Sequence, residues 1–279
     1  MVNVPPRYRS RPRSSPALPR AKKHLGQNFL TDENIIRKIV SACALQDDQP
    51  VLEIGPGRGA LTRHIAPRVK SLYAIETDPA LCGLLKELFP EDHVHLIQSD
   101  FLNFPMSGLP APVKVIGNLP YCISTPVIEK LISERHCVTE AFLTVQHEFG
   151  KRLTARPHSK DYGSLSCYIQ YYAQPQIHFL ISPSCFSPVP KVTSCFLHIS
   201  FRETKIPVTD EGLLFKLIRT AFQHRRKTLV NALAGGWEKA TILTALEQLK
   251  INPSSRAETL SLTDYCRLIN TISYNKPEI

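Results

Sequence analysis

Short apolar stretches and amphipathic stretches alternate along residues 31–150. The apolar stretches predict buried strands at 51–54, 71–75, 93–97, 113–117 and 141–145. Helical spacing, capping residues and prolines predict the other elements as helices. The first helix runs from Thr31 or Asp32 to about Leu45, and the second from the glycines after the first strand to about Pro67. Two further helices begin at Pro79 and near Pro126. Because strands alternate with helices, we expect an α/β fold with a parallel sheet covered on both faces.

The pattern changes after residue 150. A helix is predicted at 164–173, and two strands at 177–181 and 194–201 are expected to lie antiparallel at one edge of the sheet. After Pro207, apolar residues recur only at helical spacing. We therefore divide the chain into a leader at 1–21, an α/β domain at 22–205 and a small all-helical domain at 206–279.

The leader at 1–21 is rich in arginine, proline and serine and contains no acidic residue. Its prolines disfavour a helix and its composition cannot bury a core, so we expect it to be disordered. An organelle transit peptide has a similar composition, but the prolines disfavour the amphipathic helix that such a peptide needs. That interpretation is therefore secondary.

Eight cysteines are scattered along the chain without a Cys-x-x-Cys pair, so the sequence indicates neither a zinc site nor a disulfide framework. We expect reduced, mostly buried thiols in a cytoplasmic protein. No apolar run is long enough to cross a bilayer. No histidine or carboxylate spacing matches a ligand set, and we predict that the protein holds no metal.

The formal net charge of the chain is +10 and its pI is near 9.3, which favours a polyanionic partner. Basic residues cluster near both ends of the sequence. We favour nucleic-acid contact over a merely solvated face for these clusters. The residues expected to bind RNA are Lys22, Lys23 and, at the start of a predicted helix, Arg225, Arg226 and Lys227.

A glycine-rich turn, Glu53-Ile-Gly-Pro-Gly-Arg-Gly59, follows the first strand of the α/β region. Gly55 and Gly57 let the backbone approach a ligand closely at a helix N-terminus. The turn also fits a dinucleotide fingerprint, with Glu76 placed to hold a ribose diol. Glu53 favours an ammonium group over a pyrophosphate, and Asp100, after the third strand, is placed to accept from an adenine amino group. We therefore expect S-adenosyl-L-methionine rather than a nicotinamide cofactor.

A second motif, Asn118-Leu-Pro-Tyr121, follows the fourth strand, at the edge where open parallel sheets bind ligands. The Asn118 side chain and the Leu119 carbonyl are suited to accept both hydrogens of an adenine N6 amine. Tyr121 offers a face for the base, and stacking of this kind contributes about 1 to 3 kcal/mol. Acceptors and an aromatic face stabilise the positive charge that forms on the nitrogen, so no dedicated general base is required.

These motifs together resemble the small-subunit ribosomal RNA adenine N6,N6-dimethyltransferases, from Lys22 to the C-terminus. The resemblance includes Lys22-Lys-His-Leu-Gly-Gln-Asn-Phe-Leu30 and Phe186-Ser-Pro-Val-Pro-Lys-Val192. It implies a Rossmann-like class I S-adenosylmethionine-dependent methyltransferase domain with a small all-helical RNA- or ribosome-binding domain behind it. It also implies cofactor contacts from Asn28 and Leu30, and a catalytic Phe186 that sandwiches the target base against Tyr121. By the residues alone, a phenylalanine between prolines is more often a packing residue.

The resemblance implies a specific activity. The family transfers two methyl groups to each of two adjacent adenosines, in a hairpin loop near the 3′ end of 16S ribosomal RNA within a precursor small subunit. Nothing in the sequence demands more than a monomer. His147 stands where the family is expected to carry Lys or Arg. Two alternatives stay open: a large-subunit adenine methyltransferase of the macrolide-resistance type, and a non-catalytic assembly factor.

Overall fold

The computed structural model describes residues 18–22, 25–110, 112–202 and 206–274. Most of the leader, whose disorder the sequence predicts, lies outside these ranges, as does Lys23.

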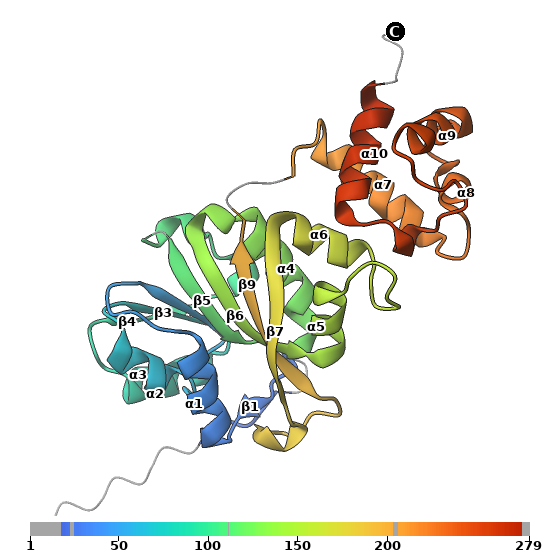
Figure 1. The fold of residues 1–279 in the computed structure, drawn as a ribbon. Coiled ribbons are helices and arrows are strands. Elements are labelled where there is room, and N and C mark those ends of the chain that lie inside the picture. The colour runs from blue at the N-terminus through green and yellow to red at the C-terminus, as the bar shows by residue number, and fades with distance from the viewer. Residues whose placement is uncertain (1–17, 23–24, 111, 203–205, 275–279) are drawn as a thin grey trace, which may run out of the picture.

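A mixed seven-stranded sheet forms the body of the molecule, in the order β4-β3-β2-β5-β6-β9-β7 (Figure 1). The first five strands in this order pair in parallel, whereas β9 is antiparallel to both of its neighbours, which confirms the predicted antiparallel edge. The strands are β2 Val51–Ile54, β3 Leu72–Glu76, β4 Val94–Gln98, β5 Val113–Asn118, β6 Val138–Gln146, β7 Ala173–Ile181 and β9 Ser194–Phe201.

Helices cover both faces of this sheet, as the alternating pattern predicts. Neighbouring residues of β5 point to opposite faces, so that Val115 joins the hydrophobic cluster beneath α4 and α6 while Ile116 joins the cluster beneath α1 and α2. The helices that pack against the sheet are α1 Glu33–Ala42, α2 Thr62–Ile65, α3 Pro79–Leu88, α4 Ser124–Ser133, α5 His147–Thr154 and α6 Ser164–Tyr172.

Two helices end differently from the sequence prediction. Asp32 caps α1, because its carboxylate accepts from the backbone of Asn34 and Ile35, but the helix stops at Ala42 since Ala44 adopts a φ of 44°. The helix after the glycines is shorter than predicted. It comprises only the four residues of α2 and a following 3-10 turn, Ala66–Arg68.

A small ladder that the sequence did not predict joins two distant segments. Strand β1, Phe29–Leu30, pairs antiparallel with β8, Phe186–Ser187, and Leu30 lies opposite Phe186. The ladder therefore brings the N-terminal motif beside the Phe-x-Pro-x-Pro motif.

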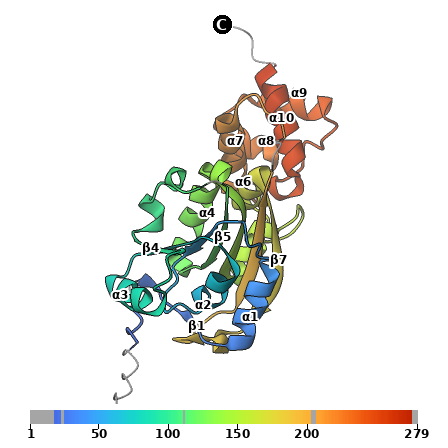
Figure 2. The same ribbon diagram turned by 90° about the vertical axis from the view of Figure 1, so that its left-hand side faces the viewer.

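The last helices are α7 Glu211–Gln223, α8 Leu229–Leu233, α9 Lys239–Gln248 and α10 Leu262–Tyr274. They pack on α6, where Phe215 lies edge-on to Tyr168 and parallel to Tyr172, and they share a hydrophobic cluster with the sheet. Figures 1 and 2 both place this helical group at the opposite end of the molecule from β1. The division into domains at residue 205 stays a prediction.

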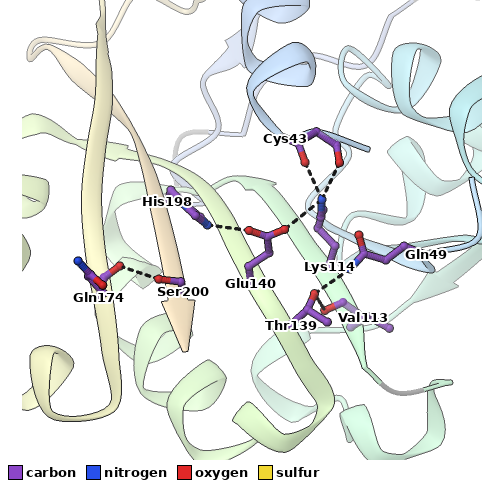
Figure 3. A network of polar contacts seen from close by, with 10 residues as sticks. Cys43, Gln49, Val113, Lys114, Thr139, Glu140, Gln174, His198 and Ser200 are labelled. Carbon is purple, nitrogen blue, oxygen red and sulfur yellow. Dashed lines mark hydrogen bonds and ion pairs between the residues drawn. The ribbon is translucent and has the colours of Figure 1, made fainter. Parts of the chain in front are cut away.

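A partly buried ion-pair network ties α1 to the sheet near the amino end of β5 (Figure 3). The Lys114 ammonium donates to the carbonyls of Cys43 and Ala44 at the end of α1, and it lies 3.1 Å from the Glu140 carboxylate. The other carboxylate oxygen of Glu140 lies 2.8 Å from Nε2 of His198. Each charged group in this network therefore has a partner.

No helix in the described part of the chain is both long and apolar enough to span a bilayer. All eight cysteines are free thiols, and all but Cys122 are buried, as the sequence predicts.

Candidate active site

A cavity of about 250 Å³ lies at the carboxyl ends of β2 and β5. The chain winds from β2 toward one sheet edge and from β5 toward the other, so this is the topological switch point where open sheets bind ligands. Every residue that the sequence assigned to the cofactor or to catalysis lines this cavity, namely Asn28, Leu30, Glu53, Gly55, Gly57, Glu76, Asp100, Asn118, Leu119, Tyr121 and Phe186.

The strand register places three polar side chains on one face of the sheet. Glu53 lies opposite Ala74 of β3 and Ile116 of β5. Glu76 and Asn118 follow those two partners by two residues each. Because side chains alternate along a strand, Glu53, Glu76 and Asn118 share a face.

The glycine turn is held in the shape that a close ligand requires. Gly55 and Gly57 have φ angles of 65° and 60°, which other residues rarely adopt. A Cβ on Gly57 would lie 3.0 Å from the Phe29 ring, so a larger residue would also displace the N-terminal motif. The Gly57 amide donates to Glu76 at 3.0 Å.

Glu53 is a buried carboxyl, 1% exposed, beneath the glycine turn. Its pKa is raised to about 7, chiefly by burial; a hydrogen bond from Thr62 opposes this rise and the neighbouring Glu76 adds to it. Thr62, whose hydroxyl donates to Glu53 at 2.8 Å, was not identified from the sequence. A bound cation would favour the charged form of Glu53.

Glu76 is also buried, and its burial raises its pKa, although backbone amides including those of Asp78 and Gly57 oppose the shift. Two buried carboxylates therefore face one cavity. Such a site suits the sulfonium and ammonium groups of S-adenosylmethionine and would repel a pyrophosphate.

Asp100 lies exposed at the rim of the cavity and caps a 3-10 turn, Phe101–Asn103. Its carboxylate accepts from the Leu102 amide at 2.9 Å and from the Asn103 side chain at 3.3 Å. This capping role explains its position, and its contact with an adenine ring stays a prediction.

The amide of Asn118 is oriented by the N-terminal motif. Its nitrogen donates to the Asn28 carbonyl at 2.9 Å, which leaves Oδ1 as the acceptor. The next peptide is fixed as well, because the Leu119 amide donates to the Thr144 carbonyl at 3.1 Å. The sequence assigned Asn28 to the cofactor but did not reveal its bond with Asn118.

The two aromatic residues differ in exposure. Tyr121 is half-buried, and its hydroxyl lies 2.7 Å from the Ser194 hydroxyl. Burial raises the pKa of Tyr121, although the Ser194 hydrogen bond opposes this. Phe186 is only 2% exposed and packs in the cluster beneath α1, so its packing role is evident. Its stacking against a base stays a prediction.

The predicted RNA-binding residues lie in two places. Lys22 is partly exposed and pairs with Asp78 at 2.8 Å. The predicted helix start at Arg225–Lys227 is wrong: these exposed residues form the turn between α7 and α8, because α7 ends before His224. Arg225 also donates to the Lys160 carbonyl at 3.2 Å. RNA contact by these residues stays a prediction.

His147 is the first residue of α5, and its amide donates to the Thr193 carbonyl at 3.0 Å. In the part of the chain that the structure describes, no group of three or more His, Cys, Asp or Glu side chains is arranged to hold a metal ion. The absence of a metal from the protein stays a prediction.

Known proteins resemble this chain over nearly its whole length. The sequence model of the family described as ribosomal RNA adenine dimethylase matches residues 19–274. The ribosomal RNA small subunit methyltransferase A of Moorella thermoacetica is 39% identical over 267 residues, which cover 91% of this chain and 93% of the relative. The protein of the same name from Streptococcus pneumoniae serotype 2 is 38% identical over 267 residues, covering 90% and 91%.

Solved structures show the same fold. A dimethyladenosine transferase from Plasmodium falciparum has a TM-score of 0.75 and 26% identity, over 86% of this chain and 95% of that chain. The 23S rRNA methyltransferase ErmE has a TM-score of 0.71 and 24% identity over 88% and 100%, a likeness that shows the fold alone. These findings confirm the Rossmann-like methyltransferase fold and S-adenosylmethionine as the cofactor. The chain belongs to the ribosomal RNA adenine dimethylase family and is an S-adenosylmethionine-dependent ribosomal RNA adenine dimethyltransferase.

Proposed function

We propose that this enzyme dimethylates N6 of two adjacent adenosines in the loop of a hairpin near the 3′ end of 16S ribosomal RNA. The substrate is a precursor small ribosomal subunit, and the modification is a step in small-subunit biogenesis. The proposal draws on the small-subunit names of the relatives in Moorella thermoacetica and Streptococcus pneumoniae. The enzyme acts as a monomer in the cytoplasm, where a reducing environment suits its eight free thiols.

The cofactor would occupy the cavity at the switch point, where it would supply an electrophilic methyl group. Glu76 would accept from the ribose hydroxyls, Glu53 would hold the ammonium group, and Asp100 would accept from the adenine amine. The remaining contacts come from the backbone and side chains of Asn28, Leu30, Gly55, Gly57 and Asn118, which line the same cavity.

The orientation of the Asn118 amide is the observation that carries the proposed chemistry. Because its nitrogen is committed to Asn28, its Oδ1 is the atom available to an N6 hydrogen, and the Leu119 carbonyl accepts the other. With both hydrogens held, the nitrogen lone pair turns out of conjugation with the ring and toward the methyl donor. Positioning of this kind supplies about 7 to 11 kcal/mol of a reaction barrier.

The same pair of acceptors suits a second transfer. After one methylation the nitrogen retains a single hydrogen, which one of the two acceptors can hold. The proton released in each round passes to water, since the nitrogen is strongly acidic once it carries the new bond. Tyr121 supplies an aromatic face beside this charge.

The substrate must be large to reach both predicted contact regions. The turn at Arg225–Lys227 belongs to the helical group, which lies at the opposite end of the molecule from β1. A folded ribosomal RNA can extend along the molecule, with phosphates at the basic turn and one loop adenosine in the pocket. A loop adenosine is already partly unstacked, which reduces the cost of extruding it.

The test is transfer of labelled methyl from S-adenosylmethionine to undermethylated small subunits, followed by mass spectrometry of the nucleosides. We expect dimethyladenosine at two adjacent loop positions, and loss of transfer with retained subunit binding in Asn118→Ala. Asn252→Ala is the matched control, because Asn252 is an exposed turn residue of the helical group. Transfer to large-subunit RNA instead would indicate a resistance-type enzyme. Binding without transfer to either subunit would indicate a non-catalytic assembly factor.

A further inference from the structure

The segment before α1 forms a strap across the cofactor cavity. We use N-terminal strap for the described residues 18–22 and 25–30. Every residue from Leu25 to Leu30 lines the cavity, so the strap forms one of its walls. A ligand in the cavity would therefore contact the strap, and the position of the strap affects the shape of the site.

Two residues of the strap, Lys22 and Gln27, contact a single buried carboxylate, that of Asp78. Asp78 is 1% exposed, and its Oδ1 accepts from the Lys22 ammonium at 2.8 Å. The side-chain nitrogen of Gln27 lies 3.4 Å from Oδ2 of the same carboxylate. The side-chain oxygen of Gln27 also accepts from the Lys22 backbone amide at 2.8 Å, so the two strap residues that contact Asp78 are bonded to each other. Both oxygens of Asp78 are thus engaged by the strap.

Asp78 also holds Glu76. Its backbone amide donates to Oε1 of Glu76 at 2.9 Å, and its Oδ1 caps α3 by accepting from the Ala80 amide at 3.0 Å. One residue therefore joins the strap, the first turn of α3 and the carboxylate proposed for the ribose.

Asp78 is charged at neutral pH. Burial acts to raise its pKa, but hydrogen bonds from Lys22, the Ala80 amide and Gln27 lower the pKa below its usual value. Among the described residues, Lys22 supplies the only ion pair to this carboxylate. If the strap moved away, the Asp78 carboxylate would lose its counter-charge. It could not follow the strap, because it caps α3.

A second set of contacts to the strap comes from Arg58 of the glycine turn. The Arg58 guanidinium sits 4.4 Å from the centre of the Phe29 ring and donates to the Pro19 carbonyl at 2.8 Å. Arg58 thus contacts the strap near both of its ends, whereas Asp78 holds Lys22 and Gln27 between them.

We propose that Asp78 is a positioning residue: together with Lys22 it forms a latch that holds the N-terminal strap over the cofactor and keeps Glu76 in place for the ribose. This inference rests on the proposed contact between Glu76 and the ribose. The latch governs how long the cofactor or its product stays bound, because the strap forms one wall of the cavity and Lys22 and Gln27 hold that wall on Asp78.

The test is the dissociation rate of S-adenosylhomocysteine from the full chain, measured by stopped-flow without RNA. Omitting RNA removes any contribution from the predicted phosphate contact of Lys22. We expect Lys22→Met to raise the dissociation rate about tenfold, as loss of a charged hydrogen bond implies. Lys22→Arg keeps the ion pair and should restore the rate.

Asp78→Asn provides a second route, since asparagine still caps α3 while the charge is lost. Asp210→Asn is the matched control, because Asp210 caps α7 in the same way without touching the strap. An unchanged dissociation rate in Lys22→Met would overturn the latch. Glu76→Ala separates the two claims: if it leaves cofactor affinity intact, the ribose assignment itself fails, whereas a loss in Glu76→Ala with no change in Lys22→Met defeats the latch alone.

Discussion

Two polar clusters, each with a buried charged residue, lie on the same face of the sheet, at opposite ends of its strands. At the amino end, Lys114 and Glu140 neutralise each other and His198 completes the network (Figure 3). At the carboxyl end, Glu53 and Glu76 line the cavity, and among the described residues no lysine or arginine pairs with either. The first cluster is balanced within the protein, and the second is not.

The difference distinguishes a structural network from a binding site. Each partner in the balanced network offsets the desolvation of the other, so the network can hold α1 on the sheet without a ligand. Buried carboxylates without a cation are costly, and the cost is recovered only when a positively charged group enters. Unbalanced buried charge in a cavity therefore marks the place where the cofactor belongs.

The largest expected effect comes from breaking the balanced cluster. Lys114→Met leaves Glu140 and two helix-end carbonyls without their donor, so we expect a loss of about 3 kcal/mol in the free energy of unfolding. Urea denaturation measures it. Lys239→Met, at an exposed lysine of α9, should stay within about 0.5 kcal/mol of the parent. A loss below about 1 kcal/mol in Lys114→Met would show that the network is not needed to hold the fold.

The next effect comes from the unbalanced cluster. Glu76→Ala removes the acceptor proposed for the ribose diol, and we expect cofactor affinity to fall about 100-fold, the equivalent of two charge-assisted hydrogen bonds. Calorimetry measures the affinity for the cofactor. The affinity for RNA, measured by a filter-binding assay, should change little. Exposed Glu91→Ala is the control, and an equal loss of both affinities would rule out the ribose assignment.

Removing the charge of Glu53 should stabilise the cofactor-free protein. The pKa of Glu53 is raised to about 7 in the fold, so stability is lost as pH rises from the ordinary carboxyl range through that value. We expect Glu53→Gln to be about 2 kcal/mol more stable than the parent near pH 8 and equal to it near pH 4, below the ordinary carboxyl pKa. Thermal unfolding across this pH range provides the check. If the difference in stability between Glu53→Gln and the parent did not depend on pH, ionisation of Glu53 would not destabilise the fold.

Sequence patterns predicted most of the fold because the patterns are local. The parallel strands, the Asp32 cap and the glycine turn each depend on a few neighbouring residues. The carboxyl-edge rule then brought Glu53, Glu76 and Asn118 together without coordinates. Placing these three residues together required only that each follows or ends a strand of one parallel sheet.

Contacts between distant segments were out of reach. The β1–β8 ladder has two residues on each side, too few for any periodicity to show. The bond between Asn118 and Asn28 and the pair Lys22–Asp78 depend on where that ladder places the strap. The basic cluster at Arg225–Lys227 was expected on a helix because its residues favour helices, but α7 ends just before it.

The smallest effect is that of Tyr121→Phe, which together with Tyr121→Ala shows what the pocket requires beside its charges. Tyr121→Phe removes only the hydroxyl that contacts Ser194, so we expect methyl transfer to slow by about threefold or less. Tyr121→Ala removes the stacking face and should slow it by about 10- to 100-fold, with less change in cofactor affinity. Single-turnover rates separate the two. Equal losses in both variants would assign the role to the hydroxyl instead.

Proton release on cofactor binding tests the central claim most directly, namely that the unbalanced carboxylates receive a cationic methyl donor. Calorimetry at about pH 6.5, in buffers of different ionisation enthalpy, counts the protons released. Binding of a cation beside Glu53 lowers its pKa, so the account predicts net proton release in the parent protein and none in Glu53→Gln. Equal heats in all buffers for the parent protein would contradict it.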